Sequence, residues 1–117
     1  MTMIEYSHQA VEDLKQIQSR IKVNWGDESA AKILQNLFVQ INRLEQFPLS
    51  GVNLGEMIDV STNYRYIYVE KNYIFYHIDS EKVRIVRILN ERQDFLYQLF
   101  GHDVKSVDDK NNDYDHE

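Results

Sequence analysis

Three arginines stand close together in the stretch VRIVRILNERQDF, which runs from Val83 to Phe95. Arg84 and Arg87 lie inside its apolar part, and Arg92 follows it. A guanidinium group can hold a phosphate through two parallel hydrogen bonds, and it can equally form a structural ion pair with a carboxylate. These residues therefore indicate either an anion-binding site or arginines that form ion pairs with carboxylates of the protein itself.

The alternation of side chains along a strand separates these arginines. Arg84 and Arg87 are three residues apart, so we expect them on opposite faces of the strand unless a bulge intervenes. Arg87 falls on the apolar face, where a guanidinium needs a partner, and Asp94 lies just past the strand end. The sequence therefore predicts a structural Arg87–Asp94 pair that docks the last helix, in preference to a catalytic role. Arg84 is expected at an exposed strand end, and Arg92 is free to reach a ligand phosphate.

Tyrosines accompany a further arginine on an earlier strand. Arg65 begins this strand, and Tyr64, Tyr66 and Tyr68 are expected on one of its faces. Such a face can stack on nucleic-acid bases, but tyrosines are also good strand formers and good protein-interface residues. We favour packing or a protein partner. His77, in the middle of the next strand, is interpreted as a buried, hydrogen-bonded histidine rather than a general base.

Composition and charge restrict the classes of function. The 117 residues fit a single domain, and 43% hydrophobic residues with four Gly and one Pro are typical of a globular chain. The net charge is −6, of which residues 103–117 carry −4, so the body is slightly acidic as well. A general nucleic-acid binder needs a basic surface. Any nucleic-acid role must therefore rest on a local patch.

Other common signals are missing from the sequence. The absence of cysteine excludes disulfides, thiol catalysis and thiolate metal sites. The N-terminus lacks a basic flank followed by an apolar segment, and no later run approaches the ~20 apolar residues of a membrane span. No glycine-rich phosphate loop occurs. We therefore expect a cytoplasmic protein that needs no cofactor and has no membrane anchor.

The last residues of the chain differ in character from the rest. We assign residues 1–102 to one domain and residues 103–117 to an acidic, flexible tail. Acidic and amide residues alternate from Asp109 to Asp115 as in a calcium-binding EF-hand loop, but Tyr114 stands where that loop needs Gly, and no closing Glu follows. We therefore expect no metal site in the tail.

Apolar residues recur at helical spacing through the first half of the chain. A stripe from Ala10 to Ile21 predicts an amphipathic helix that is capped by Ser7 and closed at Gly26. A second stripe, from Ala30 to Leu44, predicts another helix that ends before Pro48. The short connection between them predicts an antiparallel pair.

The pattern then changes to that of strands. Aromatic and β-branched runs separated by short polar turns predict an antiparallel meander. Its strands are expected at residues 64–69, 73–78 and 83–89. Met3–Tyr6 is interpreted as a further strand, residues 56–61 as an edge strand, and residues 93–100 as a short closing helix.

The order of these elements, together with the residues YRYIYVEKNYIFYHIDSEKVRIVRILNERQD, resembles the RelE/ParE family of toxins from bacterial type II toxin–antitoxin systems. The same pattern includes two upstream motifs, A-x-x-D-L and P-x-x-G, formed by Ala10, Asp13, Leu14, Pro48 and Gly51. The resemblance covers residues 4–100. It implies an α+β fold, with a helix hairpin packed on a twisted antiparallel sheet of three to four strands and a short C-terminal helix. It also implies a small antitoxin partner whose C-terminal segment wraps the open face of the toxin.

The family divides into two functions. RelE-like members resemble ribosome-dependent mRNA endonucleases that need no metal, in which basic residues hold the scissile phosphate and another side chain moves the 2′-OH proton. For a RelE-like chain the resemblance assigns catalysis to Arg65, Arg92, Tyr97 and His77. However, two further basic positions of the family fall on Ile67 and Ile74. Half of the expected cationic clamp is therefore absent.

ParE-like members resemble inhibitors of DNA gyrase that act by binding, and in them these positions are commonly apolar, as here. Asn90 also stands where the family often has His. We therefore favour a ParE-like toxin over a RelE-like mRNA interferase, and expect a hetero-oligomer with an antitoxin. Antitoxin or target binding is then assigned to Tyr64, Tyr66, Tyr68, Arg84 and Arg87. A third hypothesis is a degenerate toxin that only binds its antitoxin, with the acidic tail as an internal cover.

Overall fold

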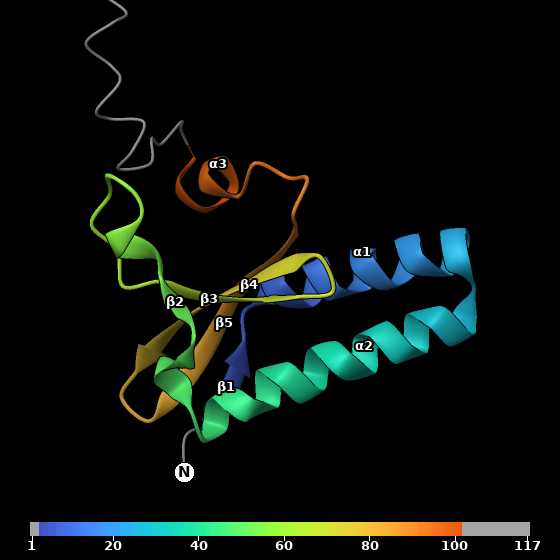
Figure 1. Cartoon of the computed structure of the whole chain (residues 1–117), viewed down its shortest axis with the longest axis horizontal. Helices are drawn as coiled ribbons and strands as arrows, with labels where there is room; N and C mark the ends of the chain where they lie inside the picture. Colours follow the sequence, from blue (N-terminus) through green and yellow to red (C-terminus); the bar gives the residue numbers. More distant parts are fainter. Residues whose placement is uncertain (1–2, 102–117) are drawn as a thin grey trace, which may run out of the picture.

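The computed structural model describes residues 3–101, which form a five-stranded sheet with helices on both of its faces (Figure 1). The helices are α1 (His8–Trp25), α2 (Asp27–Asn42) and α3 (Phe95–Phe100). The strands are β1 (Met3–Tyr6), β2 (Val52–Asn53), β3 (Arg65–Val69), β4 (Asn72–Asp79) and β5 (Lys82–Asn90). Short 3₁₀ turns follow α2 and flank β2. The acidic tail lies outside the described residues, so its separation from the domain stays a prediction.

The sheet has the strand order β1-β5-β4-β3-β2. Strands β3, β4 and β5 form the predicted antiparallel meander, and β2 pairs antiparallel with the start of β3. β1 pairs with β5 in parallel. The α+β class is thus confirmed, with a sheet that is mixed because its first strand returns alongside its last. The predicted edge strand at residues 56–61 is wrong, since the edge strand is β2, at Val52–Asn53.

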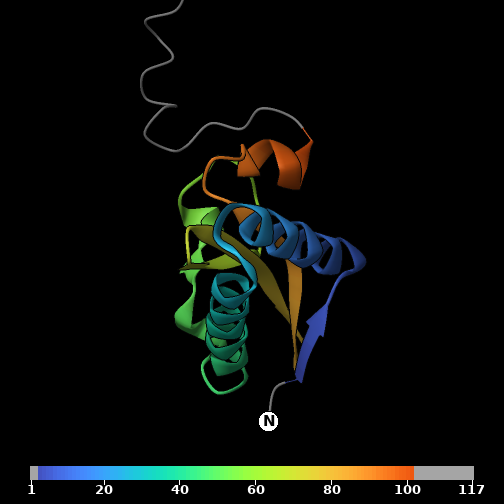
Figure 2. The same cartoon turned by 90° about the vertical axis from the view of Figure 1, so that its right-hand side faces the viewer.

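The helix hairpin covers one face of the sheet. Ser7 caps α1 by accepting a hydrogen bond from the backbone N–H of Ala10 at 3.0 Å, as its position in the sequence predicted. Gly26, at φ 93°, ends α1 and precedes α2, a backbone conformation that favours glycine. The helices run in opposite directions from this turn and diverge toward the sheet (Figures 1 and 2). Their apolar stripes and the facing strand residues form the larger core, which includes Ala10, Ile17, Leu37, Ile41, Ile74, Tyr76, Val83, Ile85 and Ile88.

The opposite face of the sheet carries the second core, beneath α3. Phe75 and Leu89 of the central strands are fully buried there. Phe95 of α3 packs its ring against Phe75 with centroids 5.2 Å apart. Asp94 caps this helix by accepting a hydrogen bond from the backbone N–H of Tyr97 at 3.1 Å. The C-terminal helix is therefore held by aromatic packing and by its own cap, and the central strands β4 and β5 carry buried residues on both faces.

A bulge interrupts the pairing of β4 with β5. Phe75 pairs with Arg87, whereas the next residue of β4, Tyr76, pairs with Ile85, so that Val86 is extra. Such a bulge reverses the alternation of side chains along the rest of the strand. None of the helices among residues 3–101 has the length and apolar character needed to cross a bilayer.

Candidate functional site

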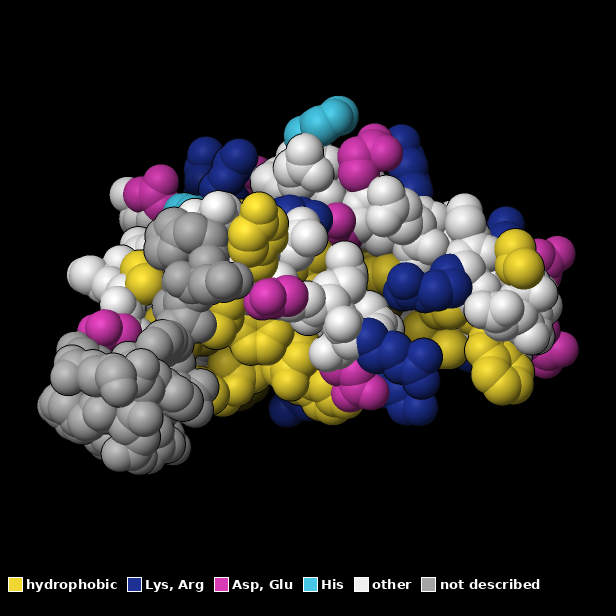
Figure 3. Space-filling model, turned by 90° about the horizontal axis from the view of Figure 1, so that it is seen from above, with side chains coloured by type: hydrophobic (Ala, Val, Ile, Leu, Met, Phe, Trp, Pro, Cys, Tyr) yellow, Lys and Arg dark blue, Asp and Glu magenta, His cyan; other side chains and the backbone are white. Residues whose placement is uncertain are grey.

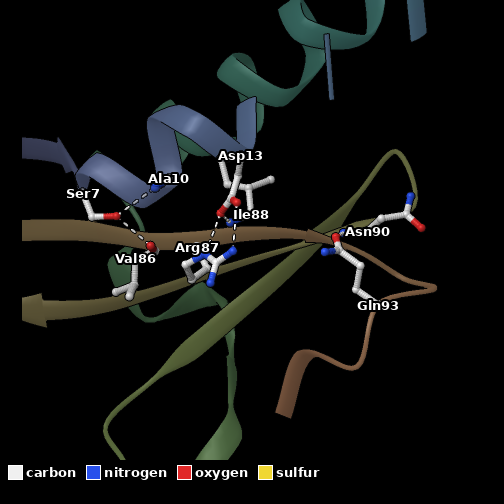
Figure 4. A network of polar contacts seen from close by, with 8 residues as sticks. All are labelled: Ser7, Ala10, Asp13, Val86, Arg87, Ile88, Asn90 and Gln93. Atoms are coloured by element: carbon white, nitrogen blue, oxygen red, sulfur yellow. Dashed lines mark hydrogen bonds and ion pairs between the residues drawn. The ribbon is translucent and has the colours of Figure 1, made fainter. Parts of the chain in front are cut away.

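Arg87 is paired with Asp13 of α1. Its Nε and Nη2 atoms donate to Asp13 Oδ2 and Oδ1 at 2.8 and 3.0 Å, a two-pronged arrangement shown in Figure 4. The predicted pairing of Arg87 with Asp94 is wrong, because Asp94 is engaged as the cap of α3. The structural interpretation of Arg87 holds with a different partner, one that lies 74 residues away in the sequence.

Asp13 also completes the edge of β5. Strand β1 ends at Tyr6, so the backbone of β5 beyond Ile85 has no strand partner on that side. Ser7 takes over first, because its N–H donates to Ile85 O at 2.9 Å and its hydroxyl donates to Val86 O at 2.7 Å. Asp13 Oδ2 then accepts from the Ile88 N–H at 2.9 Å. The start of α1 therefore takes the place of a strand, and one carboxylate satisfies both a backbone donor and a largely buried cation.

These contacts fix the charge state of Arg87. Its hydrogen bonds to the Asp13 carboxylate raise the pKa of Arg87 above the usual value, and they outweigh the opposing effect of burial. The side chains of Asp13 and Arg87 are only 8% and 18% exposed. A cation that is enclosed and already neutralised in this way has little capacity left to bind a phosphate.

The bulge changes the predicted facing of Arg84. Directly paired residues share a face, and Arg84 pairs with His77 while Arg87 pairs with Phe75 on the same strand, two residues away. The exception made for a bulge therefore applies, and the two arginines lie on the same face of the sheet. Arg84 is nevertheless not available as an unpaired cation, because its Nη1 donates to a carboxylate oxygen of Glu5 on β1.

Arg65 is held by the loop that precedes β2. Its Nη1 donates to Gly51 O at 3.0 Å. The loop is fixed in turn by the buried Tyr76, whose hydroxyl donates to Pro48 O at 2.7 Å and accepts from the Gly51 N–H at 2.9 Å. Burial raises the pKa of Tyr76, and the Gly51 N–H and Arg65 only partly offset this. The phenol therefore stays protonated at neutral pH and serves the architecture.

The residues assigned to a RelE-like site do not converge. Arg65 lies in the same row of the sheet as Ile85, whereas Arg92 follows Asn90, so they are separated by at least five residues of strand, or roughly 16 Å. Tyr97 is 51% exposed on α3 and lines neither of the hollows that contain these arginines.

His77 is half-buried rather than buried, and it follows Tyr76, the strand partner of Arg65, so its side chain lies on the opposite face of the sheet from Arg65. Its ring stacks on that of Tyr64 with centroids 5.9 Å apart. The prediction of a buried histidine is thus only partly met, and His77 pairs with Arg84, which precedes Arg92 by eight residues.

The predicted tyrosine face exists and forms a continuous aromatic surface. Tyr66 and Tyr68 each contact Tyr73 of β4, with centroids 5.3 and 5.1 Å apart. The Tyr68 hydroxyl donates to Glu91, and this hydrogen bond raises the pKa of Tyr68. Burial raises the pKa of Tyr66. A general base needs a pKa near the working pH, so these phenols are suited to contact and hydrogen bonding rather than to proton abstraction.

Two features of the molecule were not predicted from the sequence. Asp13 was seen only as a motif letter, although its place beside Ala10 and Ile17 on the apolar stripe of α1 signals a buried carboxylate that needs a partner. The second is a groove beside β3. Since β2 pairs only with the first two residues of β3, the edge from Ile67 to Val69 is left open there.

A family model described as "ParE toxin of type II toxin-antitoxin system, parDE" matches residues 4–95. The chain belongs to this family. The ParE match confirms the resemblance noted from the strand motifs and makes the chain a toxin of the type II toxin–antitoxin class. None of the curated proteins matches the sequence.

Solved structures with the same fold include toxins of two kinds. The chromosomal ParDE system of P. aeruginosa superposes with a TM-score of 0.66 at 22% identity, covering 77% of this chain and 96% of the other. The E. coli DinJ-YafQ complex gives a TM-score of 0.53 at 21% identity, covering 78% and 94%. YafQ from E. coli strain BL21(DE3) gives 0.53 at 22% identity, covering 86% and 100%. At these sequence identities the likeness shows the fold alone.

The first prediction concerns the Asp13–Arg87 pair. Replacing Asp13 with Ala leaves a largely buried guanidinium and the Ile88 N–H without a partner, so we expect a loss of about 3 kcal/mol in the free energy of unfolding. Asp13→Asn should lose less, because its amide oxygen can still accept from Ile88. Urea denaturation followed by circular dichroism measures both values.

The matched control is Glu12→Ala, which removes an exposed carboxylate one position earlier on the same helix. Its effect should stay within about 0.5 kcal/mol. Combining Asp13→Ala with Arg87→Met should recover part of the loss, because the unpaired charge is then gone. Equal, small effects of Asp13→Ala and Glu12→Ala would contradict the structural role of the pair.

Proposed function

We propose that this chain is a ParE-like toxin that inhibits DNA gyrase by binding it and is neutralised by a cognate antitoxin. The observation that carries this proposal is that the arginines on the strands of the sheet are already bound by other groups of the protein. Arg65, Arg84 and Arg87 are each engaged by groups of the protein itself, at separate places in the sheet. Metal-free RNA cleavage depends on several cations aimed at one phosphate.

The two positions where RelE-like enzymes carry further basic residues support the same proposal. Ile74 is fully buried in the core between the sheet and the helix hairpin. Ile67 packs against the same core, on the neighbouring strand. A charged side chain at Ile74 would have to be buried without a partner, at a cost of several kcal/mol. The scaffold is therefore built around apolar side chains at these positions, as in ParE-like members.

We place the surface that contacts the target on the tyrosine face. Tyr68 is 51% exposed and shares its face of β3 with Tyr66, whose hydroxyl donates to the sulfur of the exposed Met57. Aromatic and methionine side chains at a solvent-exposed surface are typical of protein interfaces. Arg84, at 42% side-chain exposure, remains a candidate for the same interface, whereas Arg87 acts through Asp13 as part of the scaffold.

We place the antitoxin in the groove beside the open edge of β3. The groove has a volume of ≈ 430 Å³ and lies between the end of α2 and β3, with Phe47, Val52 and Tyr68 among its lining residues. These three side chains are 56%, 46% and 51% exposed. An extended segment can pair with an open strand edge while its apolar side chains enter such a groove. The solved complexes with this fold include DinJ-YafQ, which supports a protein partner of this kind.

The second prediction distinguishes the two possible targets. Purified protein should stop DNA supercoiling by gyrase and should leave mRNA intact on programmed ribosomes. Tyr68→Ala should require about tenfold more protein for the same inhibition, because an aromatic side chain central to an interface often contributes more than 1 kcal/mol. The matched control is Tyr97→Ala, which removes an equally exposed tyrosine from α3.

The opposite pattern would identify the endonuclease alternative. Cleavage of mRNA on the ribosome, abolished by Tyr97→Ala or Arg92→Ala and unaffected by Tyr68→Ala, would overturn the gyrase proposal. Inactivity in both assays, with antitoxin binding retained, would instead indicate a degenerate toxin.

The third prediction tests the antitoxin groove. Phe47→Ser should weaken the complex with the cognate antitoxin by about tenfold, measured by calorimetry, because it removes an apolar contact from the groove. Leu49→Ser is the matched control, since Leu49 is an exposed apolar residue of the same loop that does not line the groove. Equal affinities of the two variants would contradict this placement.

A further inference from the structure

A second groove lies between α1 and the turn that joins β3 to β4. It consists of two adjoining hollows of ≈ 290 and ≈ 320 Å³, which share Arg20, Lys71 and Asn90 as lining residues. Arg92 lines the first hollow and Trp25 the second. Figure 3 shows Lys and Arg side chains gathered around an apolar hollow between the sheet and the tip of the helix hairpin.

The backbone that carries Lys71 is held in a strained conformation. Glu70 and Lys71 form the two-residue turn between β3 and β4, with φ angles of 52° and 64°. Such turns strongly favour Asn-Gly, because other residues pay an energetic penalty at positive φ. Strained backbone of this kind is often retained where a side chain has a function.

Several hydrogen bonds fix the cations of this groove next to one another. The buried Asn72 donates from Nδ2 to Glu70 O at 2.8 Å, which closes the turn. The Glu91 N–H donates to Lys71 O at 2.9 Å, which attaches the segment after β5 to the turn. The Arg92 N–H donates to Asn90 Oδ1 at 3.0 Å within that segment. Lys71 and Arg92 are therefore presented from two loops that are bonded to each other.

The positive charges of the groove are unpaired. Across residues 3–101, no ion pair or hydrogen bond engages the guanidinium of Arg20 or Arg92 or the ammonium of Lys71, and Arg92 uses only its backbone N–H. The two acids of the groove are occupied elsewhere, since Glu70 accepts from Asn36 Nδ2 at 3.1 Å and Glu91 accepts from the Tyr68 hydroxyl. This contrasts with the arginines of the sheet, which all have partners. The groove thus combines three free cations on a protein of net charge −6.

The remaining part of the groove is suited to an aromatic group. Trp25 is 74% exposed and lies about 7.5 Å beyond Arg20 along the axis of α1. Ile17 and Ile21 form an apolar floor beside it. Asn72 lines the same hollow and is only 2% exposed, and its Oδ1 has no hydrogen-bond partner within the described part of the chain. A buried acceptor in this state gains from a donor brought by a ligand or by an accompanying water.

We propose that this groove binds a free nucleoside phosphate. The phosphate lies against Arg20, Lys71 and Arg92, and the base stacks on the indole of Trp25, an arrangement that uses charge-assisted hydrogen bonds at one end and aromatic stacking at the other. The acidic body of the protein favours a small anion over a nucleic-acid strand, because a long polyanion would be repelled by the surrounding surface. The groove shares no lining residue with the surfaces proposed for gyrase and the antitoxin, although it adjoins the tyrosine face where Glu91 accepts from Tyr68. The proposal does not depend on either of those functions.

The chain provides its own reporter for this proposal, because Trp25 is its single tryptophan. AMP and ATP are titrated into the full-length protein with excitation at the red edge of the tryptophan band, and free N-acetyl-tryptophanamide corrects for absorption by the nucleotide. We expect saturable quenching that weakens as salt is added. Inorganic phosphate should compete with AMP without quenching. An oligodeoxythymidine that binds while AMP does not would overturn the assignment to a free nucleotide.

Charge variants test the site itself. Arg20→Gln and Arg92→Gln should each raise the dissociation constant for ATP about tenfold, because each removes a charged donor to phosphate. Lys32→Gln, which removes an exposed lysine from α2, is the matched control and should leave it unchanged. Equal quenching by ATP in Arg92→Gln and Lys32→Gln, or the absence of saturable quenching, would overturn the proposal.

A variant of the turn separates binding from folding. Replacing Glu70-Lys71 with Asn-Gly should relieve the positive-φ strain and raise the melting temperature, while removal of the lysine weakens ATP binding about tenfold. A protein that is more stable and binds ATP as tightly as before would contradict the role of Lys71. A damaged fold would lower both the melting temperature and the affinity for ATP. It therefore cannot explain a gain in stability together with a loss of binding.

Discussion

The Asp13 carboxylate closes the edge of β5 that β1 leaves unpaired. Its two oxygens accept from the Ile88 N–H and from Nε and Nη2 of Arg87. A helix side chain thus accepts the edge hydrogen bond that a neighbouring strand would otherwise accept. Without this contact α1 would cross the sheet edge above an unsatisfied backbone donor and an enclosed guanidinium, both of which are costly in a protein interior. The hairpin that covers one face of the sheet is thereby attached to the strand that leads to α3 on the other face.

This arrangement determines which cations are available for function. Arg87 is paired with Asp13, Arg84 is paired with Glu5, and Arg65 donates to the carbonyl of Gly51. The sheet therefore presents an aromatic face rather than a cationic pocket. The free cations lie instead at the opposite end of the strands, around the β3–β4 turn. On this ParE-family scaffold the exposed tyrosines and the unpaired cations therefore line different parts of the surface.

Much of the fold could be predicted from local signals. The Ser7 cap, the two apolar stripes and the three β-branched runs act over a few residues, and each gave the element that the structure contains. Contacts between distant residues could not be predicted in this way. The Arg87–Asp94 prediction chose a partner near in sequence, whereas the true partner lies across the fold, and the bulge at Val86 that moves Arg84 to the face of Arg87 has no local marker such as glycine. The groove around Lys71 was missed for a similar reason, since its three cations come from three separate segments.

Amide hydrogen exchange at Ile88 tests most directly whether a helix side chain completes this sheet. If Asp13 holds α1 on the edge of β5, the Ile88 N–H exchanges as slowly as the central amides of the β4–β5 ladder, because it opens only with the whole domain. Exchange of Ile88 as fast as that of the open edge of β3, in the intact protein at neutral pH, would contradict the account.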